Sequence, residues 1–548
     1  MNRKEFAEFL IGKTEHTKDE YEAMYPERNI NEGGIVTRFA PSPTGFVHIG
    51  HLYSSFVANR FAKQTNGLFY LRIEDTDTKR TVENGITNII RDLNNFNIKF
   101  DEGMTSDTTE VGNYGPYLQS KRADIYKAYA KDLIEKDLAY PCFLSPEEME
   151  EIRSMQEDIK ARIGIYGKYA KYRNLSIEEA VEKINNGEKY IIRLKSPGDF
   201  NNKIVVEDAI RGRLEFNEND LDIVIIKSDG LPTYHFAHAI DDHLMHTTHV
   251  IRSDEWVSSF PLHVQLFNIL GFKAPTYAHL SPLMKKDNGT VRKLSKRKDP
   301  EAAVSFYHEE GIPAYAVQLY IMTVANSNFE AWLDANPDSK IEEFTLTFDK
   351  ISPSGSLFDM DKLLNISKNY ISRLNKNEVY DMALEYSKEY DNELYGLLTK
   401  YKDYSIDVFN IEREQAKPRK DLAKFSDIKE YLWYMYDELF TPETYEFMNV
   451  TNEIEISKIL STYIDKYYNV DDKDIWFNNI KLLADELGYA SNMKEYKANP
   501  ENYKGNVADI ATVLRVALTS KSQTPDLYEI MRLFGKDRIQ NRYNKFIK

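Results

Sequence analysis

Residues 35–51 read Ile-Val-Thr-Arg-Phe-Ala-Pro-Ser-Pro-Thr-Gly-Phe-Val-His-Ile-Gly-His, and their character changes twice. The first five residues are mostly β-branched and apolar, which predicts a strand. Turn-forming residues then interrupt regular structure: Pro41, Pro43 and Gly45. From about His48 onward, apolar residues recur at helical spacing: Ile49, Leu52, Phe56 and Phe61. The stretch therefore predicts a strand, a loop and a helix.

The two histidines of His48-Ile49-Gly50-His51 fall in the first turn of this predicted helix. Unpaired backbone N–H groups and the helix dipole favour phosphate at that position. Imidazoles there can donate hydrogen bonds to a phosphate whose charge develops in a transition state. Gly50 lets a nucleotide approach without a Cβ in its way. Taken alone, the motif would be explained equally well by two solvent-facing histidines at a helix start.

A second motif, Lys293-Leu294-Ser295-Lys296-Arg297, lies much later in the chain. It follows the stretch 285–290, in which Asn288-Gly289 predicts a hairpin turn. A basic loop of this kind can close over ATP and stabilise the departing pyrophosphate. The alternative is an ordinary solvated basic loop. Because the first motif is also present, the pair indicates adenylyl transfer from ATP.

Composition narrows the class of protein. A chain of 548 residues should form several domains. Its single cysteine, Cys142, allows no internal disulfide and no cysteine-based zinc site. We find no apolar signal segment and no run of about 20 apolar residues, and we therefore expect a cytoplasmic protein. The net charge of −16 counts modestly against an RNA partner, although an RNA footprint requires only a local basic face.

Two further regions predict parts of a site. Residues 68–73 predict a strand that ends in Glu74-Asp75-Thr76-Asp77, and carboxylates at the end of a buried strand are well placed for a ligand; a helix N-cap is the alternative. We expect the same sheet to resume at 222–226 and to continue with a strand at 248–252. Five histidines between them invite a metal interpretation, but their spacing is irregular, and we interpret most of them as ordinary polar positions.

Together the two motifs resemble those of class I aminoacyl-tRNA synthetases, and Arg38 to Gly45, the segment 115–122 and the block 220–300 resemble the bacterial glutamyl-tRNA synthetases. The resemblance implies an α/β fold with a Rossmann-type parallel-sheet catalytic domain. It also implies that ATP and glutamate form glutamyl-adenylate, from which glutamate passes to the 3′-terminal ribose of tRNA-Glu. No protein nucleophile is needed, so catalysis would rest on positioning and charge stabilisation.

Charge logic and the resemblance together suggest the site residues. Glutamate carries two carboxylates and one ammonium; Arg38 and Arg252 can each bind a carboxylate in a bidentate manner, and Glu74 can bind the ammonium. The resemblance assigns the γ-carboxylate to Arg252. His238 departs from the asparagine of some relatives. The full set implied for glutamate is Arg38, Ala40, Ser42, Glu74, Tyr234, His238 and Arg252.

The resemblance also implies an ATP site and catalytic groups. The implied ATP-binding residues are Gly45, His48, Gly50, His51, Glu255, Trp256, Leu283 and Lys296. The implied catalytic residues are His48, His51, Lys293 and Lys296. We expect Mg²⁺ to accompany ATP, and we expect no zinc and no other bound metal.

The predicted domain order begins with an N-terminal extension, 1–34, to which we assign no chemistry. The catalytic domain occupies 35–113 and 218–282, interrupted by a connective insertion at 114–217 that would contact the tRNA acceptor end. A stem-contact region at 283–375 and an all-α anticodon-binding region at 376–548 follow. In the last region we expect Ile456 to Tyr467 to form a buried helical stripe. The candidate tRNA-binding patch is Arg413, Lys417, Arg419, Lys420 and Lys424.

Alternatives remain at this stage. Glutaminyl-tRNA synthetases usually carry Pro-Pro-Glu-Pro-Asn-Gly before the first motif, which differs from residues 40–45. A small-molecule nucleotidyltransferase would not use the second half of the chain, and a truncated tRNA-modifying homologue would lack it. A noncatalytic tRNA-binding paralogue should have lost His48, His51 or Lys296. We expect a monomer, without membrane association, that charges tRNA-Glu, and a non-discriminating enzyme that also charges tRNA-Gln is the main alternative.

Overall fold

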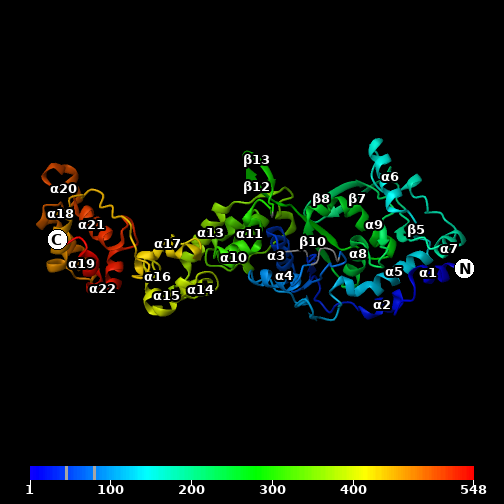
Figure 1. The fold of residues 1–548 in the computed structure, drawn as a ribbon, viewed down its shortest axis with the longest axis horizontal. Coiled ribbons are helices and arrows are strands. Elements are labelled where there is room, and N and C mark those ends of the chain that lie inside the picture. Colours follow the sequence, from blue (N-terminus) through cyan, green and yellow to red (C-terminus); the bar gives the residue numbers. More distant parts are fainter. Residues whose placement is uncertain (44–46, 78–81, 296, 548) are drawn as a thin grey trace. The chain divides into compact units, whose positions relative to one another are not determined.

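The computed structural model describes residues 1–43, 47–77, 82–295 and 297–547 (Figure 1). The chain divides into two compact units. The first comprises Met1–His308 and Val317–Asp359, and the second comprises Glu309–Ala316 and Met360–Lys548. Within the described ranges, no helix is both long enough and apolar enough to cross a membrane.

A parallel sheet forms the centre of the first unit. Strands β1 (Val36–Phe39), β2 (Leu68–Leu71) and β3 (Glu102–Met104) pair in parallel, and β4 (Glu110–Val111) adds an antiparallel edge. Strands β10 (His249–Ser253) and β11 (Thr276–Leu280) also pair in parallel. The backbone N–H of Thr248 donates to the carbonyl of Val36 at 3.0 Å and joins the two groups of strands. The expected Rossmann-type α/β fold is therefore confirmed.

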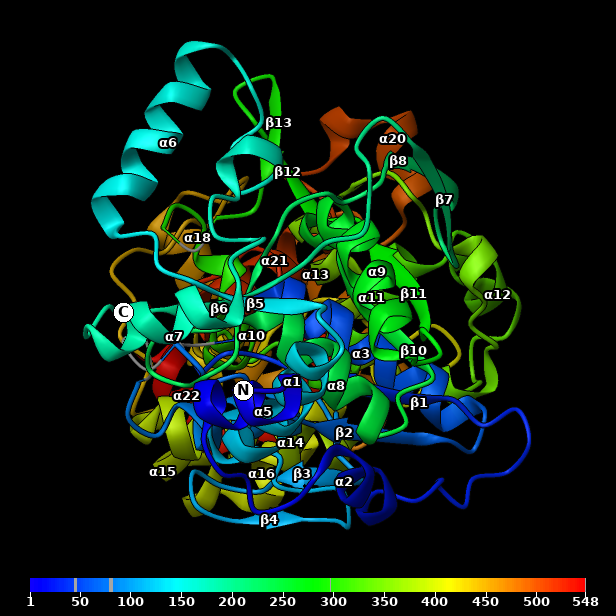
Figure 2. The ribbon, with the colours of Figure 1, turned by 90° about the vertical axis from the view of Figure 1, so that its right-hand side faces the viewer.

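Helices cover this sheet and carry the first motif. Helix α3 (Ile49–Gln64) packs on β1, β2 and β10 (Figure 2). It buries all four residues of the predicted stripe. Helix α4 (Gly85–Asn94) follows β2 in the chain. Helix α8 (Tyr234–Leu244) precedes β10, and α9 (Phe260–Leu270) joins β10 to β11. The described residues between β1 and α3, 40–43 and 47–48, lie at the carboxyl end of the parallel strands, where open α/β sheets bind their ligands.

The inserted segment has its own sheet. It contains α5 (Ala123–Glu135), α6 (Pro146–Asp158) and α7 (Ile177–Asn185) beside β5 (Ala139–Cys142), β6 (Ile191–Leu194) and β9 (Val224–Ile226). The prediction that 222–226 resumes the parallel sheet is wrong, because β9 pairs antiparallel with β6. A short apolar run indicates a buried strand but does not specify its partner.

A hairpin returns from the insertion to the catalytic sheet. Strands β7 (Lys203–Asp208) and β8 (Gly212–Asn217) pair with each other, and Asp208 pairs in parallel with Tyr277 of β11. The end of β7 therefore lies beside β11 of the catalytic sheet. Because β7 belongs to the range 114–217 that the sequence patterns assigned to the insertion, part of the predicted insertion contacts the catalytic sheet.

The second motif follows a hairpin, as predicted. Strands β12 (Leu283–Asp287) and β13 (Thr290–Lys293) are joined by Asn288 and Gly289, which have φ values of +47° and +85°. Asn-Gly favours a turn that requires positive φ at both positions. Strand β14 (Ser356–Leu357) adds to β12 in parallel, and α10 (Val304–Glu309), α11 (Ala314–Ala325) and α12 (Phe329–Ala335) follow β13 in the chain.

The N-terminal extension is folded onto the first unit. Helices α1 (Arg3–Ile11) and α2 (Lys18–Met24) both begin with capping boxes and pack on α5. The hydroxyl of Tyr190 donates to the carbonyl of Leu10 at 2.7 Å. Arg28 donates to the carbonyl of Met245 at 2.8 Å and to both carboxylate oxygens of Glu102 at 3.0 Å. The extension therefore connects the insertion to the catalytic sheet.

The second unit is helical. Its first helices are α13 (Met360–Arg373), α14 (Lys376–Tyr390), α15 (Asn392–Lys400), α16 (Lys402–Asn410) and α17 (Ile428–Leu432). They are followed by α18 (Glu453–Thr462), α19 (Lys473–Leu487), α20 (Met493–Ala498), α21 (Val507–Thr519) and α22 (Leu527–Tyr543). The predicted stripe is confirmed: α18 and the π-helical turn Tyr463–Tyr467 bury it from Ile456 to Ile464, with Tyr467 partly buried in the same core.

We predict that Arg28→Ala loosens the extension. The substitution removes buried hydrogen bonds to Glu102 and Met245 and the stacking of the guanidinium on Tyr114, whose ring centre lies 3.7 Å away. Losing one charged hydrogen bond costs about 1.5–3 kcal/mol, so amide exchange in α1 and α2 should accelerate at least about tenfold. Hydrogen-exchange mass spectrometry measures this rate. Arg91→Ala is the control, since this exposed arginine pairs with its neighbour Asp92 and not with the extension's described residues; equal exchange in both variants would contradict the prediction.

Candidate functional site

A cavity of about 430 Å³ opens at the carboxyl end of the parallel strands in the first unit. It is lined by six of the seven residues predicted for glutamate: Arg38, Ala40, Ser42, Glu74, Tyr234 and Arg252. It is also lined by residues predicted for ATP or catalysis: His48, Gly50, His51, Glu255, Trp256, Leu283 and Lys293. Gly45 and Lys296 lie outside the described residues. Segments distant in the sequence thus meet around one cavity.

The first motif positions its histidines through helix capping. His48 is the N-cap of α3, and its Nδ1 accepts a hydrogen bond from the backbone N–H of Gly50 at 3.0 Å. In the neutral ring the proton therefore lies on Nε2. A Cβ at position 50 would lie only 3.3 Å from His48 Nδ1, so glycine suits this turn. His51, one turn into the helix, is exposed at the cavity wall.

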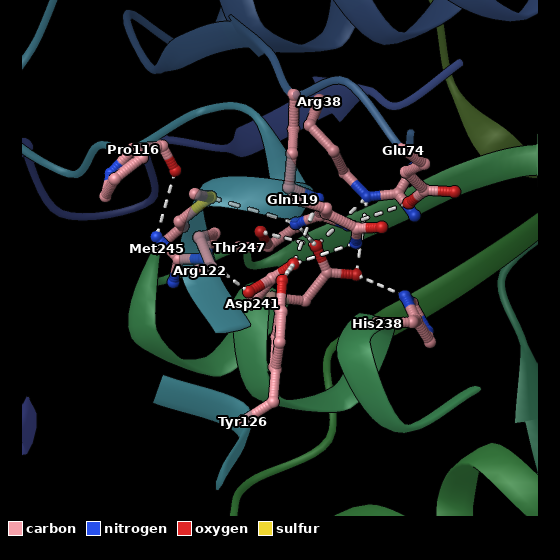
Figure 3. A network of polar contacts seen from close by, with 12 residues as sticks. Arg38, Glu74, Pro116, Gln119, Arg122, Tyr126, His238, Asp241, Met245 and Thr247 are labelled. Carbon is pink, nitrogen blue, oxygen red and sulfur yellow. Dashed lines mark hydrogen bonds and ion pairs between the residues drawn. The ribbon is translucent and has the colours of Figure 1, made fainter. Parts of the chain in front are cut away.

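A buried network of charges lies directly beneath the cavity (Figure 3). Asp242 of α8 accepts from Arg38 Nε at 3.2 Å and from Arg72 Nη1 at 2.7 Å. The neighbouring Asp241 accepts from Arg122 Nε at 2.7 Å and lies 3.7 Å from Arg72 Nε. All of these side chains are buried. The network fixes Arg38, which lines the cavity, against α8.

Glu74 joins the network from the end of β2. Its Oε1 accepts from Arg72 Nη2 at 3.3 Å, and Figure 3 shows it beside Arg38. Burial raises the pKa of Glu74 to about 7, although Arg72 and Arg38 favour its charged form. Tyr234 lies on the same wall, and burial raises its pKa to about 12, so its hydroxyl keeps its proton.

His238 lies below the cavity and is not among the residues that line it. Its side chain is fully buried, with Nδ1 2.7 Å from Asp242 Oδ2 and Nε2 2.9 Å from the hydroxyl of Tyr277. Burial lowers the pKa of His238 to about 3, which keeps the ring neutral. Its ring stacks beneath that of Tyr234, at 5.8 Å between centres. His238 therefore supports the wall from behind.

Arg252, on β10, is 6% exposed and is held by two imidazoles. Its Nε donates to His279 Nε2 and its Nη2 to His263 Nδ1, each at 3.0 Å. Its Nη1 is buried and has no hydrogen-bond partner among the described residues. The sequence patterns did not identify either histidine. His279 stands opposite Arg252 in the parallel register of β10 and β11, and a correct register would have indicated it.

The nucleotide side of the cavity is built by the segment after β10 and by the second motif. Trp256, in the 3₁₀ helix Asp254–Ser259, packs against Tyr234 at 4.2 Å between ring centres. Lys293 Nζ lies 3.5 Å from Glu255. Asp299, which the sequence patterns also missed, accepts from Arg292 and from the backbone N–H of Ser295 at 2.8 Å. Hydrogen bonding from Arg292 lowers the pKa of Asp299. The Asp299 carboxylate therefore links Arg292, at the end of β13, to the backbone of the second motif at Ser295.

Three other histidines of this region, His243, His246 and His249, each contact a different partner. His243 lies 2.9 Å from Glu22, and His246 lies 2.8 Å from the carbonyl of Tyr25, both in the N-terminal extension. His249 stacks on Phe348. Across the described part of the chain, no three His, Cys, Asp or Glu side chains form a group that could hold a metal ion.

The candidate tRNA-binding residues of the second unit differ in their availability. Arg413 donates to the carbonyls of Phe409 and Leu374, and burial lowers its pKa. Arg419 pairs with Asp421, and Lys424 pairs with Glu310. Lys417 and Lys420 are exposed. The side chains open to a ligand in this patch are therefore the two lysines.

Two family models match the chain. The model described as "tRNA synthetases class I (E and Q), catalytic domain" matches residues 34–363, and the model described as "Anticodon binding domain" matches residues 393–547. The first model begins where the N-terminal extension ends, and the second lies wholly within the helical unit.

Relatives and solved structures agree with these matches. The "Glutamate--tRNA ligase" of Clostridium perfringens (strain SM101 / Type A) is 49% identical, with 100% of each chain covered. That of Finegoldia magna is 35% identical over 93% of this chain and 99% of its own. A crystal structure titled as a glutamate tRNA ligase from Elizabethkingia meningosepticum in complex with its amino acid has a TM-score of 0.75 and 28% identity. It covers 93% of this chain and 98% of its own. The chain belongs to the glutamate–tRNA ligases, a family of class I aminoacyl-tRNA synthetases.

Proposed function

We propose that this chain attaches L-glutamate to tRNA in two steps, both of which take place in the cavity between α3, β10 and β12. As a glutamate–tRNA ligase, the chain charges tRNA with glutamate. In the first step an oxygen of the glutamate α-carboxylate bonds to the α-phosphorus of ATP and pyrophosphate leaves. In the second step a terminal ribose hydroxyl of the tRNA bonds to the glutamyl carbonyl and AMP leaves. One observation supports this proposal: the side chains of Arg38, Arg252, Glu74, His48 and His51 all line one cavity.

The glutamate end of the cavity has charges that complement the amino acid. Arg38, paired with Asp242, supplies hydrogen-bond donors for the α-carboxylate, and Arg252 supplies positive charge for the γ-carboxylate. Glu74 supplies the negative charge for the ammonium. Ala40 and Ser42 also line the cavity, and the Tyr234 hydroxyl adds a donor. The γ-carboxylate therefore balances the charge of Arg252, and the ammonium pairs with Glu74.

The nucleotide end presents donors to the phosphates. MgATP is the co-substrate, and the start of α3 offers the positive end of the helix dipole and imidazole donors from His48 and His51. Lys293 and Lys296 add the positive charge that stabilises the pyrophosphate leaving group. Residues of this type suit a triphosphate, because preorganised donors act on charge that increases as the α-phosphorus is attacked.

We predict that Lys296→Ala and His51→Ala each lower the kcat of glutamate-dependent ATP–pyrophosphate exchange, measured with tRNA present. Removing one donor to a developing charge typically costs about 10²–10³ in kcat, and we expect that range here. Lys286→Ala is the matched control, because this exposed lysine lies on β12 outside the motif. A Lys296 variant as active as the Lys286 variant would contradict the proposed role.

We predict that the KM for glutamate depends on the protonation of Glu74. Below its pKa of about 7 the side chain is neutral and cannot pair with the substrate ammonium. The KM should therefore rise as the pH falls from 8 to 6, by at most about tenfold per pH unit. Glu74→Gln should raise the KM and flatten this profile. A wild-type profile with no inflection near neutral pH would contradict the assignment.

We predict charging of tRNA-Glu with ¹⁴C-glutamate by the purified chain, with separate tRNA-Glu and tRNA-Gln transcripts as substrates and glutamine as the control amino acid. Charging of tRNA-Glu alone identifies a discriminating enzyme. Charging of both transcripts identifies the non-discriminating alternative, whose product on tRNA-Gln would need an amidotransferase downstream. Charging of neither transcript would contradict the proposal.

A further inference from the structure

Arg252 is held in the structure without an acidic partner. Its two hydrogen bonds to described residues go to imidazole nitrogens, and its guanidinium lies over the ring of Tyr277 at 4.8 Å. Within the described residues no carboxylate lies within ion-pair distance of it. Arg38, the other arginine of the cavity, is paired with Asp242. Arg38 is thus held by a charged carboxylate, whereas Arg252 is held by imidazoles. Of these two arginines, only Arg252 has a positive charge that no neighbouring carboxylate balances.

The hydrogen bonds fix the protonation of both histidines. His279 Nε2 accepts from Arg252, so its proton lies on Nδ1, which donates to Asp208 Oδ2 at 2.6 Å. His263 Nδ1 also accepts from Arg252, so its proton lies on Nε2, which donates to His235 Nδ1 at 2.8 Å. A doubly protonated ring would turn an N–H group toward the guanidinium N–H groups. Both rings must therefore be neutral.

Burial supports the neutral form of each ring. It lowers the pKa of His263 well below its ordinary value, and the positive charge of Arg252 acts in the same direction. It also lowers the pKa of His279, against the opposing effect of Asp208. Asp208 is itself anchored by the backbone N–H groups of Ile210 and Arg211, at 3.0 and 2.9 Å. The acceptors for Arg252 are consequently fixed from β7, β11 and α9.

We propose that His263 and His279 are specificity-determining positioning residues, which fix the guanidinium of Arg252 through neutral acceptors and leave its charge for the side-chain carboxylate of glutamate. This inference rests on the proposed role of Arg252. The unpartnered Nη1 is the donor left for the substrate. A buried cation without a counterion is costly, and a γ-carboxylate relieves that cost.

The same arrangement disfavours glutamine. A neutral amide leaves the guanidinium charge unbalanced, and its NH₂ group offers a donor where an acceptor is needed. Had a carboxylate held Arg252, its charge would already be balanced, and the preference for an anionic substrate would fall. Discrimination is a difference between two affinities, and it depends here on the penalty for the wrong substrate as much as on the attraction of the right one.

The decisive experiment compares His263→Asp with His263→Asn. Asparagine keeps a neutral acceptor close to the position of Nδ1, whereas aspartate supplies a counterion at nearly the same size. We measure the KM and kcat for glutamate, the Ki of glutamine as a competitor and the KM for ATP by pyrophosphate exchange with tRNA present. His279→Gln, which can present an acceptor near Nε2, gives an independent neutral replacement.

We expect His263→Asp to raise the KM for glutamate by at least about tenfold, a loss typical of one mismatched polar contact in a specificity pocket. The Ki of glutamine and the KM for ATP should each change less than about threefold, so the ratio of glutamine to glutamate affinity shifts. His263→Asn and His279→Gln should keep the parental ratio. A purely structural role would change all three constants together and would not distinguish Asp from Asn.

Equal behaviour of the Asp and Asn variants, or equal changes in the constants for glutamate and glutamine, would overturn the inference. If His263→Asp does not fold, His263→Leu takes its place: it removes the acceptor, and it should raise the KM for glutamate while His263→Asn does not. An unchanged KM in the Leu variant would then be the overturning result. Failure of the parent chain to activate glutamate would instead reject the proposed function, so the two failures are distinguishable.

Discussion

Two adjacent carboxylates on one turn of α8 determine where the elements around the site can lie. Asp241 and Asp242 are fully buried, and each carries a charge that would be costly without partners. Arg38 from β1 and Arg72 from the end of β2 approach Asp242, and Arg122 from the start of α5 approaches Asp241. Arg72 lies near both carboxylates, so its removal would weaken the compensation of both buried charges at once. Helix α8 is therefore fixed against the catalytic sheet and the insertion by the same two residues.

The two carboxylates contact different parts of the first unit, because adjacent positions on a helix point in different directions. Asp242 faces the sheet and orients Arg38 in the wall of the cavity. Asp241 also accepts from Tyr126 at 2.8 Å and from Gln119 at 2.8 Å, both of which lie in the first part of the inserted segment. The N-terminal extension attaches at the end of the same helix, through Arg28 and the carbonyl of Met245. A shift of the insertion would thus be transmitted directly to the floor of the amino-acid site.

The features that the sequence predicted are those with local causes. The strand at Val36–Phe39 and the helix that begins at Ile49 follow from residue types whose backbone preferences act within a few positions. The Asn288-Gly289 turn has the same kind of local cause. The assignment of β9 failed because an apolar run does not encode which strand it pairs with. His263, His279 and Asp208 were missed for a related reason: their partners come from other strands and helices, and only the register of β10 with β11 brings His279 to Arg252.

The two cavity arginines show why residue type alone underdetermines a site. Arg38 and Arg252 look equivalent in the sequence, each beside a strand end and each able to bind a carboxylate. In the structure, a carboxylate holds Arg38, which therefore contributes shape and hydrogen-bond donors with its charge already offset by Asp242. Neutral imidazoles hold Arg252, which therefore contributes a charge that is still unbalanced. Specificity for an anionic side chain consequently depends on the residues behind the arginine as much as on the arginine that touches the substrate.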